Sequence, residues 1–385
     1  MKIAIGAIFR DEYDAIIEWL AWHQMAGFNT FYIADNASTD GSTALLEALS
    51  DLGMLNLLHQ PVIEKRVQLL AYNRIAQQSV GLVDAVLFID ADEFITHESM
   101  KDGDEAKHLE TILANPDIGM VGINWRVFGS SGLLEYSPEP VIERFTGCCS
   151  DTEKIDNGHI KSATKIAYAN RIDVHLAQLP TSFLRVDVNG KPLTDFIAEA
   201  GIMKNVATSP LRINHYVIKS KQEFVDKKRK RGNAMRGVDY DRGMGFFEKH
   251  DFNDKTFLFP DFKITQLKKR ILKINENLIK NTTFNRKLKG VVDIINNEQI
   301  VGWILDESGS SDYLKINIFV NGLLQGTVSC GFFREGLKNT GQSKDGLNGF
   351  RYTYPRPLSK KDVVEVKVHA NKFKFPKNAS FEFLG

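Results

Sequence analysis

Apolar runs alternate with amphipathic stretches through the first ninety residues of the chain. Four short apolar runs have the length and composition of buried strands; they lie at residues 2–9, 30–34, 54–58 and 86–89. Three stretches between them carry apolar side chains at helical spacing; they lie at residues 11–27, 40–52 and 66–80. Strands that alternate with helices at this rhythm form a parallel sheet with helices on both faces. We therefore predict an α/β fold for this part of the chain.

The second and fourth apolar runs end in clusters of polar residues. Asp35 and Asn36 follow the second run, and Asp90, Asp92 and Glu93 follow the fourth. In open α/β sheets ligands bind at the carboxyl ends of the strands. Two carboxylates that an extended chain aims to one side repel each other unless a cation lies between them. Because Mg²⁺ and Mn²⁺ take oxygen ligands and bridge to phosphates, Asp90 and Asp92 indicate a metal and diphosphate site, with a solvated acidic turn as the alternative.

The hydrophobic pattern changes twice further along the chain. Residues 118–124 are typical of a strand that leads into a glycine-containing loop, 125–132, and residues 211–216 alternate before a basic helical stretch. Around residues 262–289, apolar side chains at helical spacing lie among many lysines. This predicts an amphipathic helix, which either packs on its own protein or presents a cationic surface to anionic lipid headgroups.

After residue 290 the pattern is that of short strands, and Asn321-Gly322 is a hairpin signal. A β-sandwich of about 90 residues fits this region. We expect three parts: an α/β domain at 1–260, a basic helical linker at 261–289 and a β-sandwich domain at 290–385.

Net charge, cysteine content and the length of the apolar runs argue against several classes of protein. The formal net charge of +1 is unlike that of a general nucleic-acid-binding domain, which is strongly basic. Three cysteines, two of them adjacent, make neither a disulfide framework nor a Cys-x-x-Cys metal pair. The start of the chain lacks the apolar length of a signal peptide, and no run of about 18 apolar residues predicts a membrane span. We expect a cytoplasmic protein.

The motifs of the first 230 residues, taken in order, resemble those of a bacterial glycosyltransferase of the GT-A fold, similar to the family 2 and family 92 groups. The resemblance rests on residues 9–12, 18–23, 35–41, 72–73, 88–94 and 214–227. It implies a mostly parallel sheet with helices on both faces and transfer of a sugar from a nucleotide-sugar, with a UDP-sugar favoured. It also implies inversion at the sugar and a saccharide or glycolipid acceptor in the synthesis of bacterial surface polysaccharide or lipopolysaccharide. Asp11, where the family usually has Asn, and Asn36-Ala37 depart from its pattern. The β-region is similar to an accessory domain of such enzymes.

The resemblance also assigns roles to residues at the metal and the donor. Asp92 would bind Mn²⁺ or Mg²⁺ directly, Asp90 would contact the metal or the ribose, and His215 would be a third metal ligand. The donor nucleotide would be bound by residues after the first two strands and by one on the third helix: Arg10, Asp35, Asn36 and Asn73. Among the lysines, Lys161, Lys165 and Lys219 are candidates for phosphate contacts.

An inverting transfer also needs a carboxylate base near the acceptor hydroxyl. Glu143 is the favoured candidate, with Asp151 and Glu153 as alternatives, and each could equally be a solvated or ion-paired charge. Trp125 is a candidate for the acceptor site because an aromatic face suits a sugar ring, although core packing is as plausible.

Three other functions share parts of this pattern. A phosphatase with an Asp-x-Asp nucleophile would carry this motif on its first strand, with Thr or Val two residues after the second Asp, where this chain has Phe94. A sugar-phosphate nucleotidyltransferase would have a Gly-rich basic loop after the first strand, where this chain has Phe9-Arg10-Asp11-Glu12. A non-catalytic carbohydrate-binding protein with a degenerate transferase domain would have lost its acidic motifs, and both are intact here. Loose association with the inner face of the cytoplasmic membrane is compatible with the basic stretches.

Overall fold

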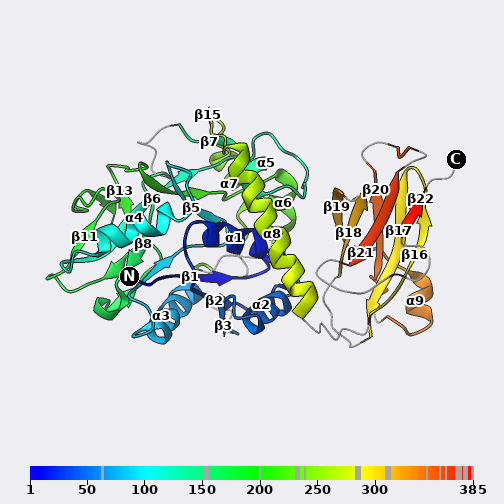
Figure 1. Cartoon of the computed structure of the whole chain (residues 1–385), viewed down its shortest axis with the longest axis horizontal. Helices are drawn as coiled ribbons and strands as arrows, with labels where there is room; N and C mark the ends of the chain where they lie inside the picture. Colours follow the sequence, from blue (N-terminus) through cyan, green and yellow to red (C-terminus); the bar gives the residue numbers. More distant parts are fainter. Residues whose placement is uncertain are drawn as a thin grey trace. The chain divides into compact units, whose positions relative to one another are not determined.

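The computed structural model divides the chain into two compact units, Met1–Ile274 and Asn275–Gly385 (Figure 1). The boundary falls inside the helix α8 (Asp261–Asn281), so the first part of this predicted linker belongs to the first unit. The structure describes residues 1–61, 65–150, 156–198, 201–229, 235–237, 240–281, 288–307, 314–321, 323–343, 346–354, 357–359, 362–368, 375 and 380–382.

The first unit is built on a large mixed sheet, which has nine strands among the described residues. Its strand order is β3-β2-β1-β4-β8-β6-β14-β5, and β11 pairs with β6. All of these strands run in one direction except β8 and β5. The strands are β1 (Ile3–Phe9), β2 (Phe31–Asp35), β3 (Asn56–His59), β4 (Ala85–Phe88), β5 (Glu93–His97), β6 (Ile118–Val127), β8 (Ile160–Thr164), β11 (Leu184–Val186) and β14 (Leu211–His215).

Helices cover both faces of this sheet. The main ones are α1 (Tyr13–Met25), α2 (Ser42–Asp51), α3 (Val67–Ser79) and α4 (Asp104–Leu113). The chain moves from β1 to β2 to β3 in one direction and returns to β4 in the other, and crossovers of this kind are right-handed. The rule therefore puts α1 and α2, which contact each other, on one face and α3 on the opposite face.

Burial on both faces explains why the strands are continuous apolar runs in the sequence. One face carries Phe9 and Phe31, which pack against Trp19 of α1 with ring centroids 5.1 and 6.1 Å apart. The other face joins α3 in a single core cluster that includes Tyr32, Ala71 and Phe88. A Cβ atom on Gly6 would meet side chains of β4 and α3 at 3.0–3.1 Å, so glycine allows this helix to pack closely.

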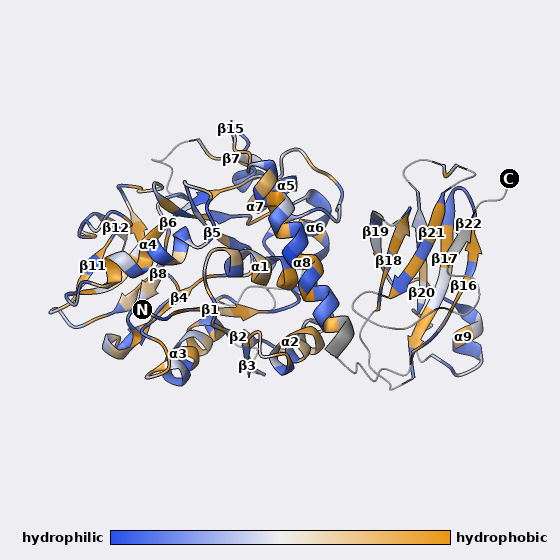
Figure 2. Cartoon of the chain, in the orientation of Figure 1, coloured by the Kyte–Doolittle hydropathy of each residue, from blue (hydrophilic) through white to orange (hydrophobic). Residues whose placement is uncertain are grey.

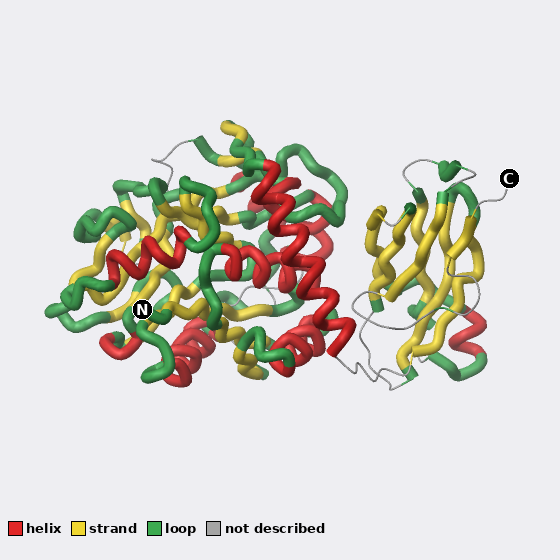
Figure 3. The backbone as a smooth tube through the Cα atoms, viewed as in Figure 1, coloured by secondary structure: helices red, strands yellow, loops and turns green. Residues whose placement is uncertain are grey.

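The remaining elements of the first unit are short. They form small two-stranded sheets and short helices outside the large sheet (Figure 3). They are α5 (Val141–Arg144), β7 (Gly147–Cys148), η1 (Ile166–Tyr168), β9 (Arg171–Ile172), β10 (Ala177–Gln178), β12 (Phe196–Ala198), β13 (Ile202–Met203), α6 (Lys221–Glu223), the π-helix η2 (Phe224–Lys228), α7 (Gly243–His250) and β15 (Lys255–Thr256).

The helix α8 is amphipathic as predicted, and its hydrophilic residues form a broad stripe in Figure 2. Within the first unit, its Leu267 and Ile274 are buried. Two of its lysines form ion pairs with acidic residues of the same unit, Lys263 with Asp102 at 2.8 Å and Lys268 with Glu143 at 2.6 Å. This part of α8 therefore packs on its own protein.

The second unit is a β-sandwich made of a three-stranded and a four-stranded sheet among the described residues. Alternating side chains from both sheets, such as Ile304, Ile318 and Val366, meet in one core cluster. Gly322 of the predicted hairpin lies outside the described residues. The elements are β16 (Leu288–Ile295), β17 (Gln299–Asp306), β18 (Lys315–Val320), β19 (Leu323–Ser329), α9 (Glu335–Asn339), β20 (Gly349–Thr353), β21 (Val363–Val368) and β22 (Ser380–Glu382).

The predicted fold class is confirmed as an α/β unit with a mostly parallel sheet, followed by a β-sandwich. One local prediction was wrong, because Trp125 lies on the strand β6 and not in the loop after it. None of the helices that the structure describes is long and apolar enough to cross a bilayer.

Candidate functional site

The acidic motif lies at the point where the strand order of the sheet reverses. β1 has β2 on one side and β4 on the other. The chain runs from β1 through β2 to β3 on one side of β1, and then crosses back to form β4 on the other side. Arg10 follows β1, Asp35 ends β2 and Asp90 follows β4, all at the carboxyl edge. Open α/β sheets bind ligands in the crevice at such a switch point.

Asp90 is held by a network of buried side chains. Its Oδ1 accepts hydrogen bonds from Gln68 Nε2 at 2.7 Å and from the Tyr72 hydroxyl at 2.9 Å. Its Oδ2 accepts one at 2.9 Å from Nζ of Lys161, a fully buried lysine on β8. Burial would raise the pKa of Asp90, but the Lys161 ammonium outweighs it and lowers that pKa. Asp90 is therefore an anion with a protein cation already beside it.

Glu93 is the second carboxyl group at Lys161. Its Oε2 lies 3.5 Å from Lys161 Nζ and accepts a hydrogen bond from the Asp90 backbone N–H at 2.9 Å. Its side chain is fully buried, and this burial raises the pKa of Glu93 well above its usual range. Since one lysine serves two carboxyl groups, Asp90 is the one that stays ionised.

Asp92 lies between an imidazole and a lysine. His215, at the end of β14, has its Nε2 3.5 Å from Asp92 Oδ1, and the Lys228 ammonium forms an ion pair with Asp92 Oδ2. Only 7% of the Asp92 side chain is exposed. Burial would raise its pKa, but Lys228 and His215 hold it well below the usual range. Asp92 is therefore a carboxylate that can attract a cation or a cationic side chain at neutral pH.

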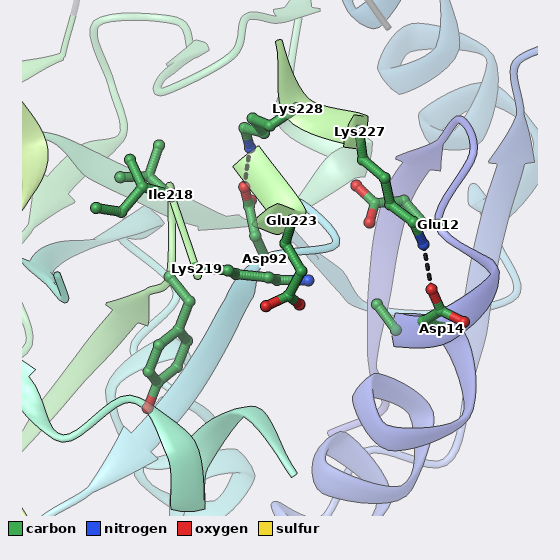
Figure 4. A pocket seen from close by; sticks show the side chains of 11 residues that line it. Glu12, Asp14, Asp92, Ile218, Lys219, Glu223, Lys227 and Lys228 are labelled. Atoms are coloured by element: carbon green, nitrogen blue, oxygen red, sulfur yellow. Dashed lines mark hydrogen bonds and ion pairs between the residues drawn. The ribbon is translucent and has the colours of Figure 1, made fainter. Parts of the chain in front are cut away.

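A pocket opens beside Asp92, between the start of α1 and the segment after β14 (Figure 4). Two neighbouring lysines extend from η2 toward carboxylates on different sides of this pocket: Lys228 reaches Asp92, and Lys227 reaches Asp14. Acidic and basic side chains line the pocket in nearly equal numbers; they are Glu12, Asp14, Asp92, Glu223, Lys219, Lys227 and Lys228. Such a lining suits a ligand that carries both a metal ion and phosphate groups.

The local sequence explains how η2 presents both lysines. The short helix α6 begins with a capping box, in which Ser220 Oγ accepts from the Glu223 N–H and Glu223 Oε2 accepts from the Ser220 N–H. Glu223 also forms a two-point ion pair with the partly buried Arg144, with distances of 2.8 and 3.2 Å. The next turn widens into a π-helix, in which the Arg229 N–H donates to the Phe224 carbonyl five residues back. π-turns often lie at functional sites.

Trp125 and His215 lie side by side because β6 and β14 are paired strands. Their ring centroids are 4.2 Å apart. On β6, Trp125 also stacks on His159 at 4.6 Å and meets His175 edge-on at 5.5 Å. Burial lowers the pKa of His175 to about 3, so this ring is neutral. These rings form an aromatic cluster, and one of its members, His215, lies beside Asp92.

The predicted nucleotide contacts Asp35 and Asn36 lie at the neighbouring edge, after β2. Asp35 accepts hydrogen bonds from Ser38 Oγ at 2.6 Å and Thr43 Oγ1 at 2.7 Å, which shape the loop before α2. Asn36 donates to the Gln60 carbonyl at 3.0 Å. Arg10 is half-buried, and its Nε lies 3.8 Å from Asp11 Oδ2.

Among the candidates, the structure brings these residues to this edge: Arg10, Asp35, Asn36, Asp90, Asp92, Trp125, Lys161, His215 and Lys219. The contacts of three others, Asn73, Lys165 and Glu143, are elsewhere. Asn73 on α3 donates to the Ile172 carbonyl and accepts from the Ile172 N–H, at 2.8 and 3.0 Å. Lys165 follows β8, which runs antiparallel to β4, and donates to the Asn115 carbonyl at the opposite end of the sheet. Glu143 is ion-paired with Lys268 of α8. Asp151 and Glu153 lie outside the described residues.

A divalent cation fits Asp92 and His215 better than it fits Asp90. The Asp92 carboxylate oxygen and the His215 imidazole nitrogen, 3.5 Å apart, are of the chemical types that bind such a cation, and Mg²⁺-type sites are commonly completed by substrate phosphates and water. Within the described part of the chain, no group of three or more His, Cys, Asp or Glu side chains is placed to hold a metal ion by itself. The oxygens of Asp90 already accept from Lys161, Gln68 and Tyr72.

Sequence reasoning missed Lys228 altogether and gave Lys161 only a phosphate role. Lys228 follows Lys227, the last residue of the motif block that begins at Asn214, so the signal was a second lysine directly after a known motif. For Lys161 the signal was a lysine inside an apolar strand. A lysine there must find a carboxylate, because an unpaired buried ammonium is too costly.

Comparisons with known proteins gave only solved structures. No family model matches the chain, and no curated protein matches it. The structure is similar to S. aureus TarS, with 12% identity and a TM-score of 0.33 over 99% of this chain and 77% of that chain. TarS residues 1–349 give 13% identity and a TM-score of 0.34 over 74% and 76%. The same TarS fragment in complex with UDP has 15% identity and a TM-score of 0.30. That match covers 44% of this chain and 48% of the TarS chain, about half of its length.

Proposed function

We propose that this protein is a metal-dependent glycosyltransferase that transfers a hexose from a nucleotide-sugar to a saccharide or glycolipid acceptor. The observation that carries the proposal is the pairing of Asp92 with His215 at the switch point of the sheet, beside a pocket that three lysines line. A diphosphate needs cations, and in this part of the described chain lysines, a candidate metal-binding pair and a strand-end crevice coincide.

The residues of the site divide the work of binding the donor. Asp92 and His215 would hold Mn²⁺ or Mg²⁺. When bound, the cation stabilises the negative charge of the departing diphosphate. Lys161 keeps Asp90 ionised, so this carboxylate can accept a hydrogen bond from a ribose hydroxyl through its part-exposed side. Arg10, Asp35 and Asn36 lie where the base would extend, across β1 and β2.

The acceptor would lie on the other side of the metal pair, against Trp125. An aromatic ring offers a flat apolar face to the C–H face of a sugar, and a sugar on Trp125 would lie close to His215, whose ring centroid is 4.2 Å from that of Trp125. An inverting displacement needs a base that takes the hydroxyl proton. Among described residues, Glu12, Asp14 and Glu223 line the pocket, and Glu143 is turned to α8.

The wider setting follows the sequence resemblance. A UDP-sugar is the first donor to test, and surface polysaccharide or lipopolysaccharide the class of product. For such a product the protein would be cytoplasmic and would act at the inner face of the cytoplasmic membrane.

The decisive experiment is release of the nucleotide from a panel of UDP- and GDP-sugars, with and without Mn²⁺. We expect slow metal-dependent release of UDP from one donor, and a loss of at least 100-fold in Asp92→Asn. Asp51→Asn, which changes an exposed carboxylate on α2, is the matched control and should keep full activity. Release that EDTA leaves unchanged, or an active Asp92→Asn protein, would refute the proposal.

A further inference from the structure

We propose that Lys228 and a divalent cation compete for Asp92, so that metal binding transfers the Lys228 ammonium from Asp92 to the donor diphosphate. This inference rests on the proposed function for its second half only. Its first half, the exchange of one cation for another on Asp92, concerns the protein without donor.

The contacts at Asp92 define the competition. Its two carboxylate oxygens face different groups: Oδ1 faces His215 Nε2, and Oδ2 faces the Lys228 ammonium. A metal ion held by Asp92 and His215 would lie within a few ångströms of that ammonium. Two cations at such a distance repel strongly in a site where Asp92 is 7% exposed and Lys228 15% exposed. The lysine must therefore withdraw when the metal binds.

The structure offers the ammonium a place to go. Lys228 lines the same pocket as Lys219 and Lys227. Rotation of its flexible four-carbon side chain can therefore move the ammonium away from Asp92 and keep it within the pocket. A diphosphate bound to the metal would present oxygens there. As the bond between the sugar C1 and the β-phosphate oxygen breaks, the electron pair stays on that oxygen. The acceptor oxygen bonds to C1 and loses its hydroxyl proton to a carboxylate base. Lys228 would then face the negative charge that forms.

The neighbouring lysine gives a matched control. Lys227 is on the same π-helix and also forms an ion pair with a carboxylate, but its partner is Asp14 at the start of α1 (Figure 4). Removing Lys227 changes the charge of the pocket by the same amount and leaves the Asp92 pair in place. Any effect specific to Lys228 therefore reports on Asp92.

The test is Mn²⁺ binding to the full-length protein without donor, measured by the electron paramagnetic resonance signal of free Mn²⁺. We expect Lys228→Met to lower the dissociation constant for Mn²⁺ at least fivefold, because the metal no longer displaces a bound cation. Lys227→Met should change it less than twofold. Lys228→Arg should raise it, since a guanidinium binds a carboxylate at two points. If Lys228→Met does not fold, Lys228→Arg alone tests the proposal: a higher dissociation constant for Mn²⁺ supports the exchange, and an equal or lower one overturns it.

A second readout separates this inference from the proposed function. At saturating Mn²⁺, Lys228→Met should lower kcat at least tenfold while the Mn²⁺ concentration for half-maximal activity falls. Equal or weaker Mn²⁺ binding by folded Lys228→Met, or no Mn²⁺ binding by the wild type, overturns the exchange. Tighter Mn²⁺ binding together with no nucleotide release from any donor would support the exchange and overturn the transferase.

Discussion

Lys161 provides the sharpest test of how the site is held together. Replacing it with Met keeps most of the apolar stem and removes the ammonium that lies 2.9 Å from Asp90 and 3.5 Å from Glu93. Removing one partner of a buried ion pair costs roughly 3–5 kcal/mol, because the other charge is left buried. Glu93 can avoid this by staying protonated, since burial already raises its pKa. The cost therefore falls on Asp90.

Asp90 keeps part of its stabilisation in the variant. Its side chain is 30% exposed, and Gln68 and Tyr72 still donate to Oδ1. We therefore expect the lower end of the range, about 3 kcal/mol at pH 7. For a domain of this size, each kcal/mol lowers the melting temperature by about 2–4 °C, so Lys161→Met should melt about 6–12 °C lower.

The pH dependence has a definite sign. In the wild type the pKa of Asp90 is lowered, so its contribution to stability is present above its unfolded pKa of about 4 and is lost as the pH falls through the lower folded pKa. Without Lys161, burial raises the folded pKa, and the variant loses stability as the pH rises. The difference between wild type and variant should therefore be largest at neutral pH and narrow toward pH 4.

Urea unfolding followed by tryptophan fluorescence at pH 4.5, 6 and 8 measures this difference. Lys165→Met is the control, because Lys165 lies beyond the other end of the same strand and donates to the uncharged Asn115 carbonyl. Lys165→Met should lose less unfolding free energy than Lys161→Met, and this loss should not grow from pH 4.5 to pH 8. Adding Asp90→Asn to Lys161→Met should restore most of the lost stability. A deficit that stays constant with pH, or no rescue by Asp90→Asn, would refute the reasoning.

Two further predictions concern Glu18 and Asn73. Burial raises the pKa of Glu18 to about 7, so the folded state binds an extra proton between about pH 4.5 and 7, and the stability due to it is lost as the pH rises through 7. Glu18→Gln should therefore be more stable than the wild type above pH 8, by about 3 kcal/mol at most, and thermal melting at pH 5 and 8.5 would show a difference only at the higher pH. Asn73→Ala should lose about 1–2 kcal/mol because it breaks the link to Ile172, yet the KM for the donor should stay unchanged; a raised KM would restore Asn73 as a nucleotide contact.

Much of the α/β unit was determined by the sequence alone. Strands buried on both faces must be continuously apolar, and helices that cover them must be amphipathic, so both patterns are local and readable. The same logic put Asp35 and Asp90 at one edge, because parallel strands share the direction of their carboxyl ends. It failed at Trp125, because the glycines that indicated a loop, Gly129 and Gly132, come only after strand β6 has ended at Val127.

Only the tertiary structure decided which charges meet. Lys161 is 71 positions from Asp90 and Lys228 is 136 positions from Asp92, and no local pattern encodes such pairs. They form because β8 lies beside β4 and because the π-helix after β14 turns its lysines toward the pocket. Sequence periodicity reports whether a residue faces water or the core; the partner of a buried charge depends on strand order and helix placement, which the whole chain sets together.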